Sequence, residues 1–327
     1  METKGKTVFI TGGTGFIASA LIGRIVNNNR VIAFDNLLRN SLKYKSYKDH
    51  PNLTLIKGDI LNRDALEAAM QEANIVVHTA AIAGIYSVGL KPVQTMRVNM
   101  VGSAYVLDCA SRLPALERCV SFSTGEVFGK YAVRPCESDE MKVGTLGEPR
   151  WTYAASKLAE EHLTIAYHNE QGLPTTIVRP FNVYGPHQVG EGALKIFIEK
   201  ALNNEQIEIH GDGSQIRSWC YIDDMVDGTL LAMTHQKAIG QSFNISNPQS
   251  VITILGLAQT VVRVLDSRSE IKFVEKQHAD VDVRIPTAEH AAKLLGFKAK
   301  VSLEEGIRLT AESYRSQPEL LKHTAVS

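Results

Sequence analysis

The sequence predicts an α/β fold: a parallel, doubly wound sheet with a smaller region of mixed helices and strands after it. Two observations lead to this prediction. Short apolar strands alternate with helical segments over residues 7–180, and a turn with three glycines joins the first strand to the first helix. Strands that alternate with helices form a parallel sheet, and ligands bind at the carboxyl ends of its strands. No linker rich in Pro, Gly or Ser separates the two halves, so we expect them to interleave.

The first strand, turn and helix carry the most specific signal. Residues 7–10 form an apolar strand and residues 16–26 an amphipathic helix. Gly12 can take a positive φ, and Gly15 has no Cβ to obstruct the approach of a pyrophosphate to the backbone. The helix N-terminus presents free N–H groups to the phosphates. Asp35 ends the next apolar run, where a carboxylate accepts bonds from ribose hydroxyls and repels a 2′-phosphate, so the pattern predicts NAD rather than NADP.

Length and composition exclude several classes of protein. The 327 residues are 44% hydrophobic and 21% charged, which favours a folded protein over disorder. The 35 basic and 35 acidic residues cancel, so neither nucleic acid nor an anionic membrane surface is an expected partner. The four cysteines lack metal-ligand spacing, which predicts reduced thiols and no metal site. With no targeting or membrane-spanning segment in the sequence, we expect a cytoplasmic protein.

Further strands are predicted at residues 53–56, 75–78 and 119–123, and a long helix at residues 92–113. Asp59 follows the first of these strands and is placed to meet the adenine, although it could equally cap the helix that begins near Asp64. His78 lies within an apolar strand, and we interpret it as a hydrogen-bonded core histidine. The small residues after it, Ala80, Ala81 and Ala83, leave room for a cofactor at the carboxyl end of that strand.

The residues suited to chemistry follow the fifth strand. Tyr153 and Lys157 are four residues apart on a predicted helix and therefore share one face. A nearby ammonium lowers the pKa of a phenol and favours the tyrosinate. With the hydroxyl of Thr124 opposite, this pair can remove a proton from a substrate hydroxyl while the adjoining carbon gives hydride to a nicotinamide.

The sequence resembles the extended short-chain dehydrogenase/reductases, and more narrowly the NAD-dependent nucleotide-sugar epimerase/dehydratase group, in three motifs. These are GGTG at residues 12–15, YAASK at 153–157 and RPFNVYGP at 179–186. The resemblance implies a tightly held NAD that oxidises a sugar carbon, usually C4. It also implies a Rossmann-type NAD-binding domain over residues 1–180, which includes the tyrosine–lysine helix, and a nucleotide-sugar-binding region over residues 181–327 that interleaves with it.

The resemblance further implies which residues bind the ligands. Cofactor contacts are expected from Gly12, Gly15, Phe16, Ile17, Asp35, Asn36, Arg39, Asp59, Ile60, Ala80, Ala81, Ala83, Tyr153, Lys157, Pro180 and Val183. Contacts with the nucleotide sugar are expected from Thr124, Asn182, Arg217 and Arg284. Members of the group often dimerise through two long helices of each subunit, here residues 92–113 and 153–171, so a homodimer is expected.

Glu126 bears on which reaction the site performs. Members of the group that do further chemistry on the 4-keto sugar carry a Glu at this position, whereas 4-epimerases carry a small or hydroxyl residue. A carboxylate over C5 can remove the proton that the 4-keto group acidifies. We therefore expect a dehydratase acting on a UDP-hexose or UDP-hexosamine such as UDP-GlcNAc, with Thr124, Glu126, Tyr153 and Lys157 as its catalytic residues.

Gly125 leaves other reactions open. The dTDP-glucose 4,6-dehydratases carry Thr-Asp-Glu, and glycine here replaces the aspartic acid. UDP-glucuronate decarboxylases carry Thr-Ser-Glu; residues 143–153 resemble bacterial members, and Arg284 stands where those enzymes have an active-site arginine. Decarboxylation is the second hypothesis and 4-epimerisation the third. A different class is a non-catalytic NAD-bound sensor or scaffold, against which the intact hydroxyl, phenol and ammonium argue.

Overall fold

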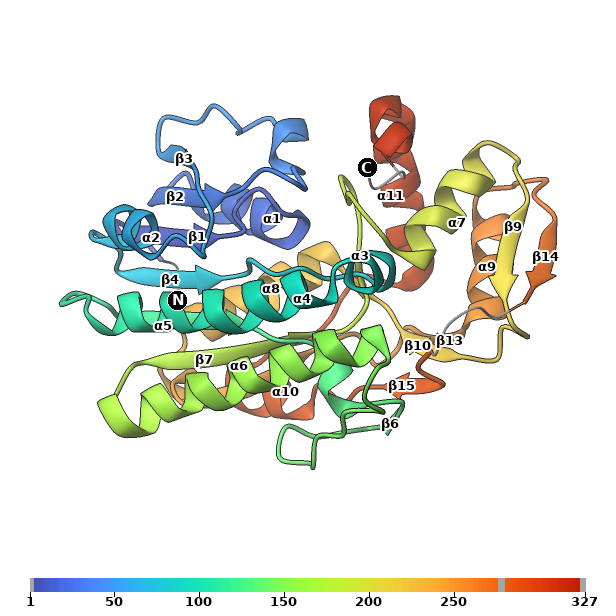
Figure 1. The fold of residues 1–327 in the computed structure, drawn as a ribbon. Helices are drawn as coiled ribbons and strands as arrows, with labels where there is room; N and C mark the ends of the chain where they lie inside the picture. Colours follow the sequence, from blue (N-terminus) through green and yellow to red (C-terminus); the bar gives the residue numbers. More distant parts are fainter. Residues whose placement is uncertain (1–2, 276–279, 324–327) are drawn as a thin grey trace.

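The structure is a computed structural model that describes residues 3–275 and 280–323. Within these residues a seven-stranded parallel sheet has the order β12-β7-β5-β4-β1-β2-β3 (Figure 1). Its strands are β1 (Thr7–Thr11), β2 (Arg30–Asp35), β3 (Leu53–Lys57), β4 (Ile75–His78), β5 (Arg118–Phe122), β7 (Thr175–Pro180) and β12 (Gln241–Ile245). The strand order reverses between β1 and β4, which places a ligand-binding crevice at their carboxyl ends. The predicted Rossmann-type, doubly wound α/β fold is confirmed.

Helices cover both faces of the sheet because successive side chains of a strand point to opposite faces. In β1, Phe9 lies in one apolar core, whereas Val8 and Ile10 lie in the other. The core of Phe9 is closed by α2 (Arg63–Met70), α5 (Ser103–Ser111) and α6 (Pro149–Gln171). The opposite core is closed by α1 (Phe16–Ile25) and α8 (Ile222–Thr234).

The helix predicted at residues 92–113 is continuous but not uniform. It begins as α4 (Pro92–Met96), passes through a π-helical turn at Arg97–Gly102 and ends as α5. The π-helical turn contains Asn99, whose amide is tied to both backbone groups of Ile82 in the loop after β4 and to the Ser156 hydroxyl. This segment therefore connects the helix to the carboxyl edge of the sheet, where π-turns frequently serve a site.

The second half of the chain builds smaller sheets (Figure 1). One has the order β13-β10-β15-β6, and two others pair β8 with β11 and β9 with β14. These strands are β6 (Tyr131–Val133), β8 (Val183–Tyr184), β9 (Ile207–His210), β10 (Ile216–Ser218), β11 (Cys220–Tyr221), β13 (Val251–Thr253), β14 (Ile271–Val274) and β15 (Val283–Ile285). The remaining helices are α3 (Ile85–Leu90), α7 (Ala193–Leu202), α9 (Ile254–Val264), α10 (Glu289–Leu295) and α11 (Leu303–Ser316).

The two halves of the chain, before and after residue 180, each contribute a strand to the other half's sheet. Strand β12, from the second half, completes the large sheet beside β7, and β6, from the first half, joins the small sheet beside β15. We retain the division at residue 180 as a proposal about function rather than about packing. In the part of the chain that the structure describes, no helix combines the length and apolar character needed to cross a membrane.

Candidate active site

The glycine turn between β1 and α1 is shaped to receive a dinucleotide. Gly12 has φ +68°, and a Cβ added there would lie 2.7 Å from the backbone nitrogen of Ala80. Gly15 precedes α1 and, having no side chain, leaves the first N–H groups of this helix without a side-chain cap. Uncapped N–H groups at a helix N-terminus bind phosphate. The turn therefore fits a pyrophosphate, and only glycine suits its first position.

Asp35 stands at the carboxyl end of β2, beside this turn. It is 8% exposed, and its carboxylate accepts hydrogen bonds from the backbone N–H groups of Thr14 (3.0 Å) and Leu37 (2.6 Å). These bonds fix the acid at the end of the strand, next to the glycine turn. That placement suits the role predicted from the sequence, a partner for the adenosine ribose.

The other residues proposed for the cofactor follow the ends of neighbouring strands. Asn36 follows β2, Asp59 and Ile60 follow β3, and Ala80, Ala81 and Ala83 follow β4; Pro180 ends β7 and Val183 begins β8. Asp59 also accepts a hydrogen bond from the Leu61 N–H, and so caps its own loop. These positions lie along the carboxyl edge of the sheet, as a dinucleotide site requires.

Arg39, unlike the other proposed cofactor residues, connects two loops through its side chain. Its guanidinium donates to the Ser87 hydroxyl (2.8 Å) and to the Glu191 carboxylate (3.2 Å). Glu191 also accepts from the N–H groups of Tyr86 and Ser87 at the start of α3. Arg39 thus ties the loop after β2 to the loop before α7, a contact that the sequence pattern does not indicate.

Tyr153 and Lys157 share one face of α6, as predicted, but their electrostatics differ from the prediction. The Lys157 ammonium donates to the Phe122 carbonyl and to the Glu160 carboxylate, both at 2.7 Å. Burial, and next the charge of Glu126, raise the pKa of the Tyr153 phenol, although a hydrogen bond with Thr124 opposes the rise. The expectation of a lowered pKa was therefore wrong for the arrangement seen here, because burial and the charge of Glu126 raise it, and Glu160 adds a smaller effect in the same direction.

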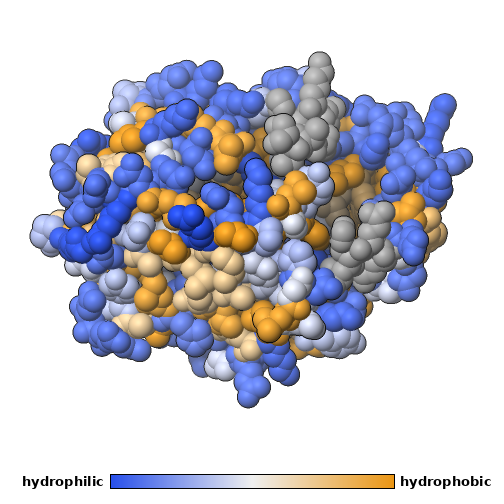
Figure 2. Space-filling view, in the orientation of Figure 1, coloured by the Kyte–Doolittle hydropathy of each residue, from blue (hydrophilic) through white to orange (hydrophobic). Residues whose placement is uncertain are grey.

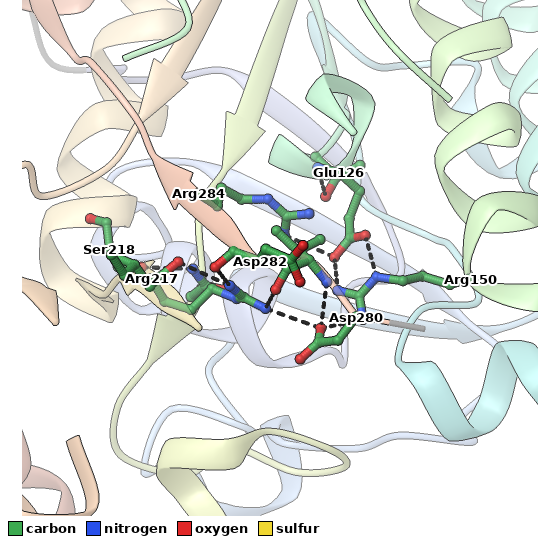
Figure 3. A network of polar contacts seen from close by, with 11 residues as sticks. Glu126, Arg150, Arg217, Ser218, Asp280, Asp282 and Arg284 are labelled. Carbon is green, nitrogen blue, oxygen red and sulfur yellow. Dashed lines mark hydrogen bonds and ion pairs between the residues drawn. The ribbon is translucent and has the colours of Figure 1, made fainter. Parts of the chain in front are cut away.

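Glu126 is held by two arginines (Figure 3). Arg150 donates through Nε (3.1 Å) and Nη2 (2.9 Å), one to each carboxylate oxygen, and Arg284 donates through Nη1 (2.9 Å). Burial would raise the pKa of this carboxyl, but the charges of Arg284 and Arg150 and their hydrogen bonds bring it down to about 2. Glu126 is therefore a fixed anion at neutral pH.

The small sheet explains why Arg217 and Arg284 meet here. Arg217 on β10 and Arg284 on β15 are direct neighbours in the parallel register of these strands. Asp280 joins the group, since its Oδ1 accepts from Arg150 Nη1 (2.9 Å) and Arg217 Nη2 (3.0 Å) (Figure 3). Burial lowers the pKa of Arg217 to about 10. Asn182 contacts the same strand as Arg217, because its amide donates to the carbonyl of Ser218 on β10 (2.7 Å).

Sequence reasoning missed Arg150, Asp280 and Glu160 as members of the site. Arg150 precedes Tyr153 by three residues, so the helix periodicity that joined Tyr153 to Lys157 could also have included it. Glu160 follows Lys157 by three residues and was open to the same argument. Asp280 carried no such signal, because it is separated from Arg150 by 130 positions in the sequence.

Comparison with known proteins identifies the class to which this fold and site belong. A dinucleotide turn at the switch point, with a tyrosine–lysine helix at the same sheet edge, is the arrangement of the NAD-dependent short-chain dehydrogenase/reductases. More particularly, the chain belongs to the NAD dependent epimerase/dehydratase family, whose model matches residues 8–246. It is an enzyme family that uses NAD, and the glycine turn described above fits this cofactor.

Individual relatives and solved structures support the same assignment. The chain is 34% identical over 314 residues to UDP-glucuronic acid decarboxylase 3 of Arabidopsis thaliana, covering 94% of this chain and 89% of that protein. It is 31% identical over 320 residues to a UDP-N-acetyl-alpha-D-glucosaminuronate decarboxylase of Bacillus cytotoxicus, covering 95% and 98%. UDP-glucuronic acid 4-epimerase from Bacillus cereus, solved with UDP-glucuronic acid and NAD, superposes with a TM-score of 0.86 at 26% identity, covering 95% and 99%.

Proposed function

We propose that this protein is an NAD-dependent decarboxylase of a UDP-hexuronate, that is, of UDP-glucuronate or its 2-acetamido counterpart. The two relatives described above act on these two acids by their names. The sequence alone placed a dehydratase first and the decarboxylase second. The contacts of Glu126 and Arg284 lead us to reverse that order.

The observation that carries the proposal is the state of Arg284. Its guanidinium is 3% exposed, and only Nη1 is bonded, to Glu126. The Nε and Nη2 atoms are buried and have no hydrogen-bond partner among the described residues. Buried donors without a partner are costly, and a guanidinium edge with two free N–H donors matches the two oxygens of a carboxylate. A sugar whose C6 is a carboxylate would satisfy them, whereas a hexose hydroxymethyl group offers one oxygen.

The chemistry then needs little from the protein beyond positioning. NAD, held by the glycine turn and Asp35, would take a hydride from C4 of the sugar and return it to C4 after the carboxylate is lost. Tyr153 takes the proton of the C4 hydroxyl in its tyrosinate form, and Thr124 bonds the same oxygen. The product is a β-keto acid: its C5–C6 bond breaks, carbon dioxide leaves, and the electron pair enters an enolate that includes the C4 oxygen. A proton from solvent then adds to C5. Arg284 orients the carboxylate before it is lost.

Two features disfavour the dehydratase. Loss of water from C5 and C6 needs an acid and a base, but Glu126 is paired with two arginines and has a pKa near 2, which makes it a poor proton carrier at neutral pH. An acid at position 125, as in the dTDP-glucose enzymes, has no room: a Cβ on Gly125 would lie 2.5 Å from the ring of Phe181, which is itself buried. The 4-epimerase remains third, because it leaves Glu126 and the arginines without a function.

The test is to incubate the purified protein in D₂O with UDP-glucuronate, UDP-N-acetylglucosaminuronate, UDP-GlcNAc and UDP-glucose, and to follow each by NMR and mass spectrometry. We expect a hexuronate to lose carbon dioxide and gain deuterium at C5. Loss of water from UDP-GlcNAc would instead support the dehydratase, and a C4 epimer without deuterium the epimerase. Tyr153→Phe should reduce turnover by roughly three orders of magnitude yet still bind UDP-sugar. If Tyr153→Phe and the parent protein do not differ in these measurements, the sensor or scaffold would be favoured.

We also propose a homodimer that pairs the helices at residues 92–113 and 153–171 of each subunit. The support is a row of exposed apolar side chains on the first of these segments: Val93 is 74% exposed, and Met100 and Val101 are also exposed. Figure 2 shows hydrophobic side chains gathered over the helices that face the viewer in Figure 1. Val93→Glu should yield a monomer by light scattering, whereas Leu146→Glu, at an exposed leucine outside these helices, should not. A Val93→Glu variant that keeps the mass of the parent protein would exclude this interface.

The state of the cysteines bears on the cellular compartment. All four cysteines are free thiols, and three of them are buried. Free cysteines are typical of a reducing compartment, so we propose a cytoplasmic protein.

A further inference from the structure

Glu160 is a buried acid that the chemistry above does not use. It lies on α6 one turn after Lys157 and is 1% exposed. Its Oε2 accepts a hydrogen bond of 2.7 Å from the Lys157 ammonium, whose other protein partner is the Phe122 carbonyl at the end of β5. Lys157 is itself 1% exposed. The ammonium is thus fixed between a strand end and a carboxylate in a site closed to water.

The second oxygen of Glu160 faces a neutral network. Its Oε1 lies 3.9 Å from His78 Nε2, and His78 is held by the hydroxyls of Thr11 (2.6 Å) and Ser103 (2.8 Å). Burial, with the nearby charge of Lys157, lowers the pKa of His78 to about 3, so the ring is neutral and offers Glu160 no opposing charge. The predicted core histidine is confirmed. The titratable and polar groups that face Glu160 from its own helix and from β4, α5 and β5 are Lys157, Glu161, His78, Ser103 and Cys119.

The charge of Glu160 also reaches the phenol. Burial and the charge of Glu126 are the larger causes that raise the pKa of Tyr153, and Glu160 acts in the same direction. Thr124 and Arg284 oppose them. A lysine beside a tyrosine promotes ionisation of the phenol only to the extent that no anion cancels its charge. Lys157 and Glu160 together are close to neutral, unlike a lone ammonium.

We infer that Glu160 is a positioning residue, which anchors the Lys157 ammonium on the helix face that it shares with Tyr153 and cancels part of its charge there. The inference deepens the proposed function, because it rests on the roles assigned to Tyr153 and Lys157. In physical terms, the protein gives up part of the activation that lysine offers and gains a buried cation with a fixed position.

The first test needs no substrate. The ultraviolet absorbance of tyrosinate is titrated in the parent protein and in Glu160→Gln, and the same titration of each protein carrying Tyr153→Phe is subtracted. We expect the ionisation midpoint of Tyr153 to fall by about one pH unit in Glu160→Gln, since the ammonium is then uncompensated. Circular dichroism at each pH identifies the range in which both proteins stay folded. Glu161→Gln removes the same charge from the adjacent position, where the acid pairs with Arg179, and should leave the midpoint unchanged.

A second readout is the pH dependence of the rate at which bound NAD is reduced by UDP-glucuronate. The acid limb of this profile should move to lower pH in Glu160→Gln and stay in place in Glu160→Asp, which keeps the charge. A Tyr153 midpoint and an acid limb that both stay in place in a folded Glu160→Gln protein would overturn the inference and leave Glu160 a structural acid. If no hexuronate reduces NAD, the proposed function fails, but the tyrosinate titration still decides the role of Glu160.

Discussion

Two carboxylates in this site, the partly buried Glu126 and the fully buried Glu160, meet opposite electrostatic conditions. Glu126 receives three hydrogen bonds from two guanidinium groups, and its pKa falls to about 2 despite burial. Glu160 receives one hydrogen bond from a single ammonium, and burial raises its pKa. The comparison teaches that more cationic donors and less complete burial together make Glu126 the permanent anion of the two. The two acids consequently suit different tasks: Glu126 fixes arginines for an anionic ligand, and Glu160 tunes a phenol.

The largest effect should come from removing Glu126. Glu126→Ala leaves the buried guanidiniums of Arg150 and Arg284 without their shared carboxylate, and loss of one partner of a buried ion pair costs about 3 kcal/mol. Urea unfolding should therefore show a clear fall in the free energy of unfolding. Glu117→Gln is a suitable control, because Glu117 pairs with Lys6 at the surface and should change stability little. Equal effects of the two substitutions would show that the arginine cluster does not stabilise the fold.

The two acids should also give opposite pH dependences of stability. The folded-state pKa of Glu126 is depressed from its ordinary 4.5 to about 2, so its contribution is complete above pH 5 and is lost as the pH falls toward 2; the loss is about 3 kcal/mol. The folded-state pKa of Glu160 is raised, so its penalty is present at neutral pH and is relieved by acid.

The measurement is the difference in unfolding free energy between the parent protein and each glutamine variant as a function of pH. On acidification, the unfolding free energy of the parent protein should fall relative to that of Glu126→Gln. Relative to that of Glu160→Gln, it should rise. Parallel curves for the two variants would contradict the assignment of opposite shifts.

The smallest effect should come from Asp280, which faces water more than the arginines it binds. Its side chain is 28% exposed, against 7–8% for Arg150 and Arg217. Asp280→Asn removes an anion that competes with a substrate phosphate for Arg217, so KM for a UDP-sugar should fall about two- to five-fold. Asp282→Asn is the matched control, because this acid pairs with the exposed Lys130. A rise in KM for Asp280→Asn alone would mean that Asp280 orients the arginines instead.

The comparison also separates what the sequence could predict from what it could not. The glycine turn, the strands up to residue 180 and the tyrosine–lysine helix follow from local patterns, since each depends on residues a few positions apart. The arginine cluster depends on four distant segments and on the register that sets Arg217 beside Arg284. The pKa shift of Tyr153 was mispredicted because only one charge on its helix, Lys157, was considered. Its larger causes, burial and the charge of Glu126, depend on the folded structure, and Glu160, three residues after Lys157, adds to them.

Strand β12 has a consequence for how the protein is made. It covers the outer edge of β7, and α8, which precedes it, closes the core against α1. While the ribosome is still synthesising the chain between residues 180 and 245, β7 therefore presents an unpaired strand edge and α1 lacks its covering helix. Such an edge is a template for pairing with another chain. The nucleotide-binding half, although first in the sequence, cannot finish folding first, and the nascent chain must remain shielded until β12 has left the ribosome.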